Sequence, residues 1–231
     1  MQKRNPWPAW VLGCLALFAA GAAWALPPPP QSWQPDVDRL VADDSAHPPP
    51  QNGVLFVGSS SIRMWTDLAA DFPGVPVIDR GFGGSAIADS TYYADRIVIP
   101  WHPRLVVMYA GDNDIAEGDT PAQVSDAFKA FVARVRRALS DVAIAYISIK
   151  PSLARAALWP QMREANRMVA DWSRQQKDIT FVDVAARMLD ASGKPRAELF
   201  RADGLHMDAA GYAIWVQALK PVLARHGFAV H

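Results

Sequence analysis

The chain carries an acid and a histidine at a spacing that suits proton transfer, in the segment Asp203-Gly204-Leu205-His206. A carboxylate three residues before a histidine can lie on the same turn and accept a hydrogen bond from the Nδ1–H group of the imidazole. That bond fixes the tautomer in which Nε2 can take a proton from a nucleophile. The simpler interpretation is a helix-capping Asp followed by an incidental His, so this pair alone does not establish a site.

A nucleophile is available in Gly58-Ser59-Ser60-Ser61, which follows the apolar run Val54-Leu55-Phe56-Val57. A hydroxyl between a buried strand and a helix would be exposed and close to helix N-terminal N–H groups, in a tight turn that Gly58 permits. Serine is also a preferred N-cap, and at least one of the three is expected to serve only as a cap. The residues alone do not rank the three serines.

Donors for a developing oxyanion are available in two further segments. Gly83-Gly84 could present a backbone N–H group without a Cβ atom in the way, and Asn113 could present a side-chain NH₂ group. The alternatives are a loop that needs positive φ at Gly81, Gly83 and Gly84, and a turn built on Asp-Asn-Asp around Asn113.

Two other motifs compete for the same residues. Gly81 to Ala86 fits G-x-G-x-x-A, but this dinucleotide fingerprint should follow the first strand of a domain, whereas here it follows the second. Asp112-Asn113-Asp114 resembles the start of a calcium loop, but that loop requires Gly where this chain has Glu117. We therefore predict neither site.

The elements that must position these residues alternate between strand and helix patterns. Short apolar runs, typical of buried strands, cover residues 54–57, 75–78, 105–109, 142–149 and 179–182. Helix patterns cover residues 62–70, 86–97, 121–139, 160–176 and 209–225, with Thr120 as N-cap of the third. This alternation predicts a parallel sheet covered by helices on both faces, with the site at the carboxyl ends of its strands.

Composition narrows the function classes. The 231 residues are 51% hydrophobic, which suits one globular domain, and 23 basic residues balance 23 acidic ones. No run of Lys or Arg stands out, so nucleic acid is not an expected partner.

The first 25 residues have the pattern of a secretory signal peptide. Lys3 and Arg4 precede an uncharged stretch from Trp10 to Trp24, and Ala23-Trp24-Ala25 has the form of a cleavage site. We expect cleavage after Ala25 and an exported protein, periplasmic or secreted, with a membrane anchor formed by residues 5–25 as the alternative. Cys14, the single cysteine, lies in this segment, so the mature chain would have neither disulfides nor cysteine-bound metal.

Proline-rich sequence follows the signal segment. Pro27 to Pro30 and Pro48 to Pro50 flank a polar stretch, and we predict a stiff linker over residues 26–51 and a folded domain over residues 52–231.

Taken in order, four segments resemble the blocks of the SGNH (GDSL-type) hydrolase family, which carry Ser, Gly, Asn and His. Residues 56–62 resemble block one and place Ser60 as nucleophile, although Ser59 stands where the family usually has Asp. Residues 80–85 resemble block two, which places Gly84 as the glycine of the oxyanion hole. Gly111-Asp112-Asn113-Asp114 matches block three, which places Asn113 as the asparagine of the oxyanion hole. The last block has the pattern Asp-x-x-His, which places Asp203 as the orienting acid and His206 as the base. The resemblance spans residues 54–223.

The resemblance implies a flavodoxin-like three-layer α/β/α sandwich with strand order 2-1-3-4-5. It also implies a serine esterase with a triad of Ser60, His206 and Asp203, an oxyanion hole of Ser60, Gly84 and Asn113, and no cofactor or metal. The expected substrate is a small acyl ester, a short-chain or acetyl ester that can belong to a carbohydrate. The alternatives are an acyltransferase, a lysophospholipase or a thioesterase using the same site, or a non-catalytic binding protein of the same fold.

Overall fold

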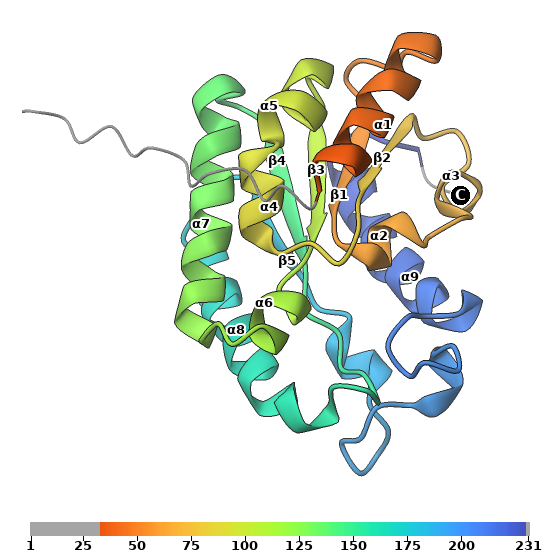
Figure 1. Ribbon diagram of the computed structural model, residues 1–231, viewed down its shortest axis with the longest axis vertical. Coiled ribbons are helices and arrows are strands. Elements are labelled where there is room, and N and C mark those ends of the chain that lie inside the picture. Colours follow the sequence, from red (N-terminus) through yellow and green to blue (C-terminus); the bar gives the residue numbers. More distant parts are fainter. Residues whose placement is uncertain (1–32, 230–231) are drawn as a thin grey trace, which may run out of the picture.

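The computed structural model describes residues 33–229, so the predicted signal peptide over residues 1–25 lies outside it. Five parallel strands form one sheet in the order β2-β1-β3-β4-β5 (Figure 1). This confirms the predicted sheet and its strand order. The strands are β1 (Val54–Gly58), β2 (Val77–Gly81), β3 (Leu105–Tyr109), β4 (Ala143–Ile147) and β5 (Ile179–Val182).

Helices cover both faces of the sheet, as predicted (Figure 1). One face carries α1 (Gln34–Ala46), α4 (Ile87–Tyr92), α5 (Ala94–Ile97), α7 (Pro121–Ala138) and α8 (Trp159–Ser173). The other carries α2 (Ser60–Arg63), α3 (Leu68–Asp71) and α9 (Ala209–Arg225), while α6 (Asp112–Ala116) follows β3 at the edge of the sheet. Within residues 33–229, no helix is both long enough and apolar enough to cross a membrane.

Side chains of the central strands alternate between two apolar cores. Leu55 and Val57 point into the core beneath α4, α5, α7 and α8, whereas Val54 and Phe56 point into the core beneath α9. All four are fully buried, so β1 reads as a continuous apolar run, which is the pattern of a parallel strand covered on both faces.

The strand register brings three loops to one level. Gly58, the last residue of β1, is aligned with Gly81 at the end of β2 and with Tyr109 at the end of β3. The segments that leave these strands therefore begin side by side, as expected for a site at the carboxyl edge of a parallel sheet.

Several element boundaries differ from the predicted ones for local reasons. β2 begins at Val77 rather than Val75 because Pro76 cannot donate to the ladder, although its carbonyl accepts the Val54 N–H group at 2.9 Å. The helix predicted over residues 62–70 is two short helices, α2 and α3, with Trp65 buried between them. Pro121 and Thr120 start α7 as predicted, and the Thr120 hydroxyl accepts the Gln123 N–H group at 3.3 Å.

The linker predicted over residues 26–51 is wrong for its described part, because residues 34–46 form α1 and pack against the domain. Val37 is fully buried in the core shared with α5. The Trp33 ring packs edge-on against Phe82, and its Nε1–H group donates to Asp89 Oδ2 at 3.0 Å. Val37, Leu40 and Val41 pack against the core at the i, i+3, i+4 spacing of an amphipathic helix, a signal that the proline runs on either side led the prediction to overlook.

A buried ion pair joins α1 to the sheet. Asp44 of α1 accepts a hydrogen bond from Arg80 of β2, and the two side chains are only 9% and 6% exposed. A second pair between the same helix and the domain, Asp38 with Arg96, lies at the surface at 2.8 Å. The two pairs differ mainly in burial, so their contributions to stability should differ.

We predict that Asp44→Ala lowers the free energy of unfolding by about 3 kcal/mol, because it removes the carboxylate that pairs with the buried Arg80 charge and leaves only neutral contacts at hydrogen-bond distance. The matched change Asp38→Ala should cost less than about 1 kcal/mol, because its partner stays in water. Urea unfolding of both variants measures the difference. Equal losses would show that Arg80 is not held by Asp44 in the folded protein.

A buried carboxyl group connects two of the loops at the carboxyl edge. Asp114 of α6 is 1% exposed, and its Oδ1 atom accepts the N–H group of Ile87, the first residue of α4, at 3.0 Å. Burial raises the pKa of Asp114 to about 7, although its backbone hydrogen bonds act in the opposite direction.

This shift makes stability depend on pH. Between about pH 4, the ordinary pKa of Asp, and about pH 7, folded Asp114 keeps a proton that the unfolded chain has released. The free energy of unfolding should therefore fall as pH rises through this window, by at most about 1.4 kcal/mol per pH unit. We predict that Asp114→Asn removes this contribution, measured as a flatter pH dependence in urea unfolding from pH 4.5 to 8. Parallel curves for the two proteins would contradict it.

Candidate active site

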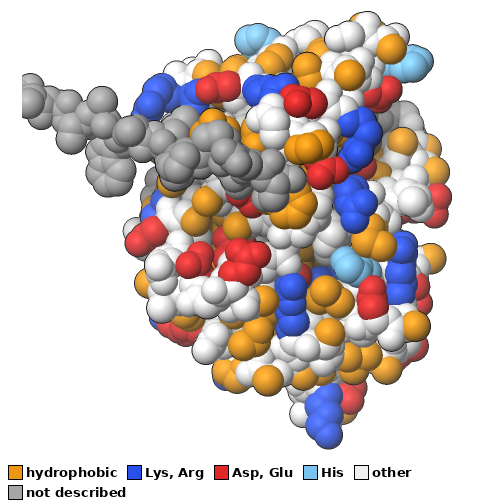
Figure 2. All heavy atoms as spheres, viewed as in Figure 1, with side chains coloured by type: hydrophobic (Ala, Val, Ile, Leu, Met, Phe, Trp, Pro, Cys, Tyr) orange, Lys and Arg blue, Asp and Glu red, His pale blue; other side chains and the backbone are white. Residues whose placement is uncertain are grey.

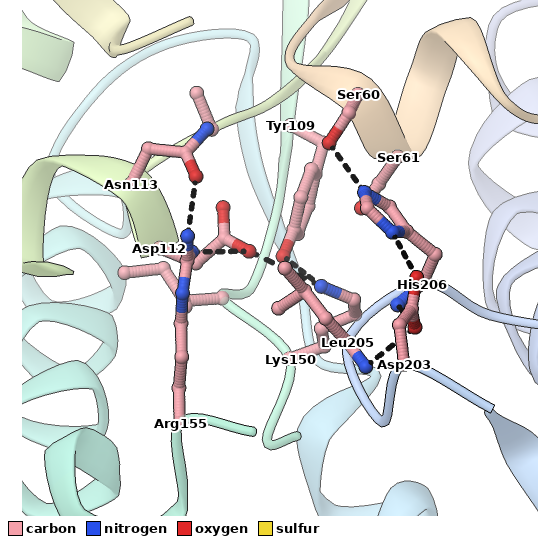
Figure 3. Close-up of polar contacts among 12 residues, drawn as sticks. Ser60, Ser61, Tyr109, Asp112, Asn113, Lys150, Arg155, Asp203, Leu205 and His206 are labelled. Atoms are coloured by element: carbon pink, nitrogen blue, oxygen red, sulfur yellow. Dashed lines mark hydrogen bonds and ion pairs between the residues drawn. The ribbon is translucent and has the colours of Figure 1, made fainter. Parts of the chain in front are cut away.

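Ser60 is the serine that the fold presents. Gly58 ends β1 with φ of 143°, and a Cβ atom there would lie 1.8 Å from the Tyr109 carbonyl oxygen, so only glycine fits the turn. Ser59 and Ser61 are 1% and 2% exposed. The Ser60 Oγ atom instead lies 3.0 Å from His206 Nε2 (Figure 3). The structure thus separates three serines that residue type alone left unranked, and the one that is not buried and contacts His206 is Ser60, the serine that the family resemblance indicated.

Asp203 holds the other side of the imidazole. Its Oδ2 atom lies 2.7 Å from His206 Nδ1, and its Oδ1 atom accepts the backbone N–H groups of Leu205 and His206, each at 2.9 Å. The hydrogen bond from the His206 ring, with those from the two backbone groups, lowers the pKa of the Asp203 carboxyl well below its ordinary value. An ionised carboxylate therefore accepts the Nδ1–H bond and leaves Nε2 to face Ser60.

Backbone bonds fix the loop that carries Asp203 and His206. Arg201 N–H donates to the His206 carbonyl at 2.8 Å, and Gly204 N–H donates to the Arg201 carbonyl at 2.9 Å. Gly204 has φ of 64°, and its carbonyl accepts the Ala154 N–H group at 3.0 Å. The loop before α9 is therefore tied to the loop that follows β4.

The glycines after β2 have three different roles. Gly81 is required by close packing, because a Cβ atom there would lie 2.1 Å from the Arg63 nitrogen, and Gly83 has φ of 46° with the Trp33 ring against it. Gly84 has neither restriction: a Cβ atom there would meet only Asn113, with Nδ2 at 3.7 Å. Gly84 thus lies beside the Asn113 amide.

Asn113 is fixed at the start of α6. Gly111 precedes this helix with φ of 117°, and a Cβ atom there would lie 2.8 Å from the Tyr146 hydroxyl and from Ile149 Cδ1. The Asn113 Nδ2 atom donates one hydrogen bond to the Ser85 carbonyl at 3.1 Å, and the side chain is buried. An amide nitrogen has two protons, so a second remains for another acceptor.

Four charged or phenolic side chains beside Asn113 were not predicted as site residues. They form one contact network (Figure 3), made of Tyr109, Asp112, Lys150 and Arg155. Lys150 directly follows the apolar run of the fourth predicted strand, and a lysine at the carboxyl end of a buried strand could have been recognised. Arg155 lies five residues further along a loop, where no sequence pattern singles it out.

The surface around this site carries mixed charge. Figure 2 shows basic, acidic and apolar side chains interspersed over the described part of the face drawn in Figure 1. Within residues 33–229, no group of three or more His, Cys, Asp and Glu side chains is placed to hold a metal ion.

The geometry suits nucleophilic acyl transfer. A hydroxyl is in hydrogen-bond contact with an imidazole, the imidazole is oriented by a carboxylate, and an uncharged amide lies close by. The Ser60 N–H group belongs to the first turn of α2, where backbone N–H groups have no partner within the helix.

Comparisons with known proteins show the family and the fold of the chain. Residues 52–214 match the model of the GDSL-like lipase/acylhydrolase family. A GDSL-like lipase from Bacteroides thetaiotaomicron is similar in structure, with a TM-score of 0.72 at 21% identity over 82% of this chain and 98% of that one. No match was found among curated proteins.

Two further solved structures are similar in fold. One is a member of the lipolytic G-D-S-L family from Veillonella parvula, with a TM-score of 0.61 at 16% identity over 74% of this chain and 98% of that one. The other is a mutant of Axe2, an acetyl-xylooligosaccharide esterase from Geobacillus Stearmophilus, with a TM-score of 0.59 at 17% identity over 78% and 96% of the two chains. The family match covers more than half of the chain, and the chain is a carboxylic ester hydrolase that belongs to the GDSL-like lipase/acylhydrolase family.

Proposed function

We propose that the protein is an exported serine esterase that hydrolyses small acyl esters through Ser60, His206 and Asp203. The observation that carries this proposal is the unbroken contact from Asp203 Oδ2 to His206 Nδ1 at 2.7 Å and from His206 Nε2 to Ser60 Oγ at 3.0 Å.

The reaction proceeds through an acyl-enzyme. Ser60 Oγ attacks the carbonyl carbon while its proton passes to His206 Nε2. The resulting oxyanion accepts hydrogen bonds from the backbone N–H groups of Ser60 and Gly84 and from the Asn113 amide. The tetrahedral intermediate then breaks its bond to the alcohol oxygen, which takes the proton from His206. Water repeats the cycle on the ester of Ser60 and releases the carboxylic acid.

The surface favours a small, water-soluble ester. Leu153 is the exposed large hydrophobic residue found within residues 33–229, at 42%. Leu153 lies against Gly204, in the loop that carries Asp203 and His206. With this one large exposed apolar side chain, the described surface offers no broad apolar face for a lipid aggregate. The likeness to an acetyl-xylooligosaccharide esterase is in keeping with an acetylated carbohydrate as substrate.

Export rests on the sequence alone. The pattern of residues 1–25 supports a cleaved signal peptide, and the mass and N-terminal sequence of the protein recovered from a periplasmic or secreted fraction would test it. A retained N-terminus in a membrane fraction would point to the anchor formed by residues 5–25.

The nucleophile is tested by Ser60→Ala, with Ser59→Ala and Ser61→Ala as matched controls. We expect Ser60→Ala to lose fluorophosphonate labelling and hydrolysis of nitrophenyl esters, whereas both controls keep their labelling. Labelling that persists in Ser60→Ala would assign the nucleophile to a neighbour, and absence of reaction in the wild type would indicate a binding protein.

In a series of nitrophenyl esters of increasing acyl length, the wild type should hydrolyse the acetyl and butyryl esters fastest. When an acceptor alcohol is added, the ratio of transferred ester to free acid measures acyltransferase activity against hydrolysis.

The role of the carboxylate is tested by Asp203→Asn. The amide keeps the shape of the side chain but can hold the imidazole in the wrong tautomer, so kcat for nitrophenyl acetate should fall by about 10³–10⁴-fold. Because Asp203 is half exposed at the surface, the melting temperature should change little. An Asp203→Asn variant with wild-type kcat would remove Asp203 from the mechanism.

A further inference from the structure

Arg155 contacts two consecutive residues of α6. Its Nη2 atom donates to Asn113 Oδ1 at 2.8 Å, and its Nη1 atom lies 3.2 Å from Asp112 Oδ2. Figure 3 shows the guanidinium end-on to both side chains, with the backbone of Arg155 on the loop after β4. A planar guanidinium with donors in a fixed fork suits such a double contact better than an ammonium group does.

These contacts determine which way the Asn113 amide faces. Asn113 Oδ1 accepts from Arg155, and Nδ2 donates to the Ser85 carbonyl at 3.1 Å. A flipped amide would point its NH₂ group at the guanidinium donors and its oxygen at the Ser85 oxygen, losing both bonds. Without Arg155 only the Ser85 carbonyl would distinguish the two orientations.

The network also contains more positive than negative charge. Asp112, 4% exposed, is shared between Lys150, 1% exposed, and Arg155. Burial opposes ionisation of Asp112, but the two cations outweigh it and hold the pKa of the carboxyl below its ordinary value. Burial raises the pKa of Tyr109 well above its ordinary value, so the phenol that accepts from Lys150 stays neutral. Two cations therefore face one carboxylate behind the Asn113 amide.

We propose that Arg155 is a positioning residue of the oxyanion hole, which fixes the Asn113 amide with its NH₂ group toward the reacting carbonyl and strengthens that donor through the excess positive charge. This inference rests on the proposed esterase function and extends it to a residue outside the triad and the four family blocks. The effect appears in the transition state, where the carbonyl oxygen gains charge, and therefore in kcat more than in KM.

The location of Arg155 supports this role. Ala154, the preceding residue, donates its N–H group to the carbonyl of Gly204 in the loop of Asp203 and His206. Asn166 of α8 holds the start of the same loop, accepting from Ile149 N–H at 2.7 Å and donating to its carbonyl at 2.8 Å. The guanidinium is thus held relative to both the imidazole and the amide.

A double-mutant cycle between Arg155→Met and Asn113→Ala tests the proposal, with kcat and KM for nitrophenyl acetate as the readout. Arg155→Met should lower kcat by about 10- to 100-fold, and Asn113→Ala by about 100-fold or more. Because Arg155 acts through Asn113, the double variant should be no more than about threefold slower than Asn113→Ala alone. KM should stay within about threefold of wild type for Arg155→Met. Effects that multiply, or an Arg155→Met variant with wild-type kcat, would overturn the proposal.

Controls separate positioning from folding and from the function itself. Arg155→Met leaves the Lys150–Asp112 pair intact, and its melting temperature should confirm a folded protein. If it does not fold, Arg155→Lys replaces it in the same cycle and should lie between wild type and Asn113→Ala in kcat. Arg163→Met removes an exposed arginine of α8 and should keep wild-type kcat. A wild type that forms no acyl-Ser60 overturns the esterase function, whereas an active wild type with an additive cycle overturns only the role of Arg155.

Discussion

The main chain at the carboxyl ends of β1, β2 and β3 is packed so closely that side chains are excluded at two positions. Gly58 lies against the Tyr109 carbonyl, and Gly81 lies against the backbone of Arg63. Because these strand ends are level, the turn to Ser60, the loop to Gly84 and the start of α6 leave the sheet together. The remaining geometry follows from this constraint, since the triad loop and the loop of Arg155 have only to reach that edge.

The chemistry divides between two sides of Ser60. On one side His206 and Asp203 form a short, partly exposed chain of hydrogen bonds, which moves a proton in the proposed mechanism. On the other, Asn113 is backed by the buried Lys150 and the partly buried Arg155, whose proposed role is electrostatic. A buried and preorganised cation needs no reorientation when charge develops on the substrate, whereas the imidazole must gain and lose a proton and benefits from contact with water.

The sequence predicted most of this architecture because its strongest patterns are local. Apolar strands of four or five residues, separated by amphipathic helices, specify a parallel sheet, and the order of four short blocks specifies the family. Contacts between residues far apart in the chain produce no comparable sequence pattern. The helix α1 packs through Val37, Leu40 and Val41, but nothing in the sequence pairs its Asp44 with Arg80 of a distant strand. Arg155 likewise gains its role only when a loop folds back over α6. The residue types alone did not rank the three serines, since neighbouring hydroxyls differ only in where the turn points them, and the prediction of Ser60 rested on the family resemblance.

The central claim, that Ser60 is the atom acylated with help from His206, is tested most directly by trapping the intermediate. The protein would be mixed with nitrophenyl acetate, quenched in acid and digested, and the acetylated peptide sequenced by mass spectrometry. We predict acetyl on Ser60 in the wild type, and a greatly slowed appearance of that adduct in His206→Ala. Acetyl on Ser59 or Ser61, or acylation of Ser60 at an unchanged rate without the imidazole, would contradict it.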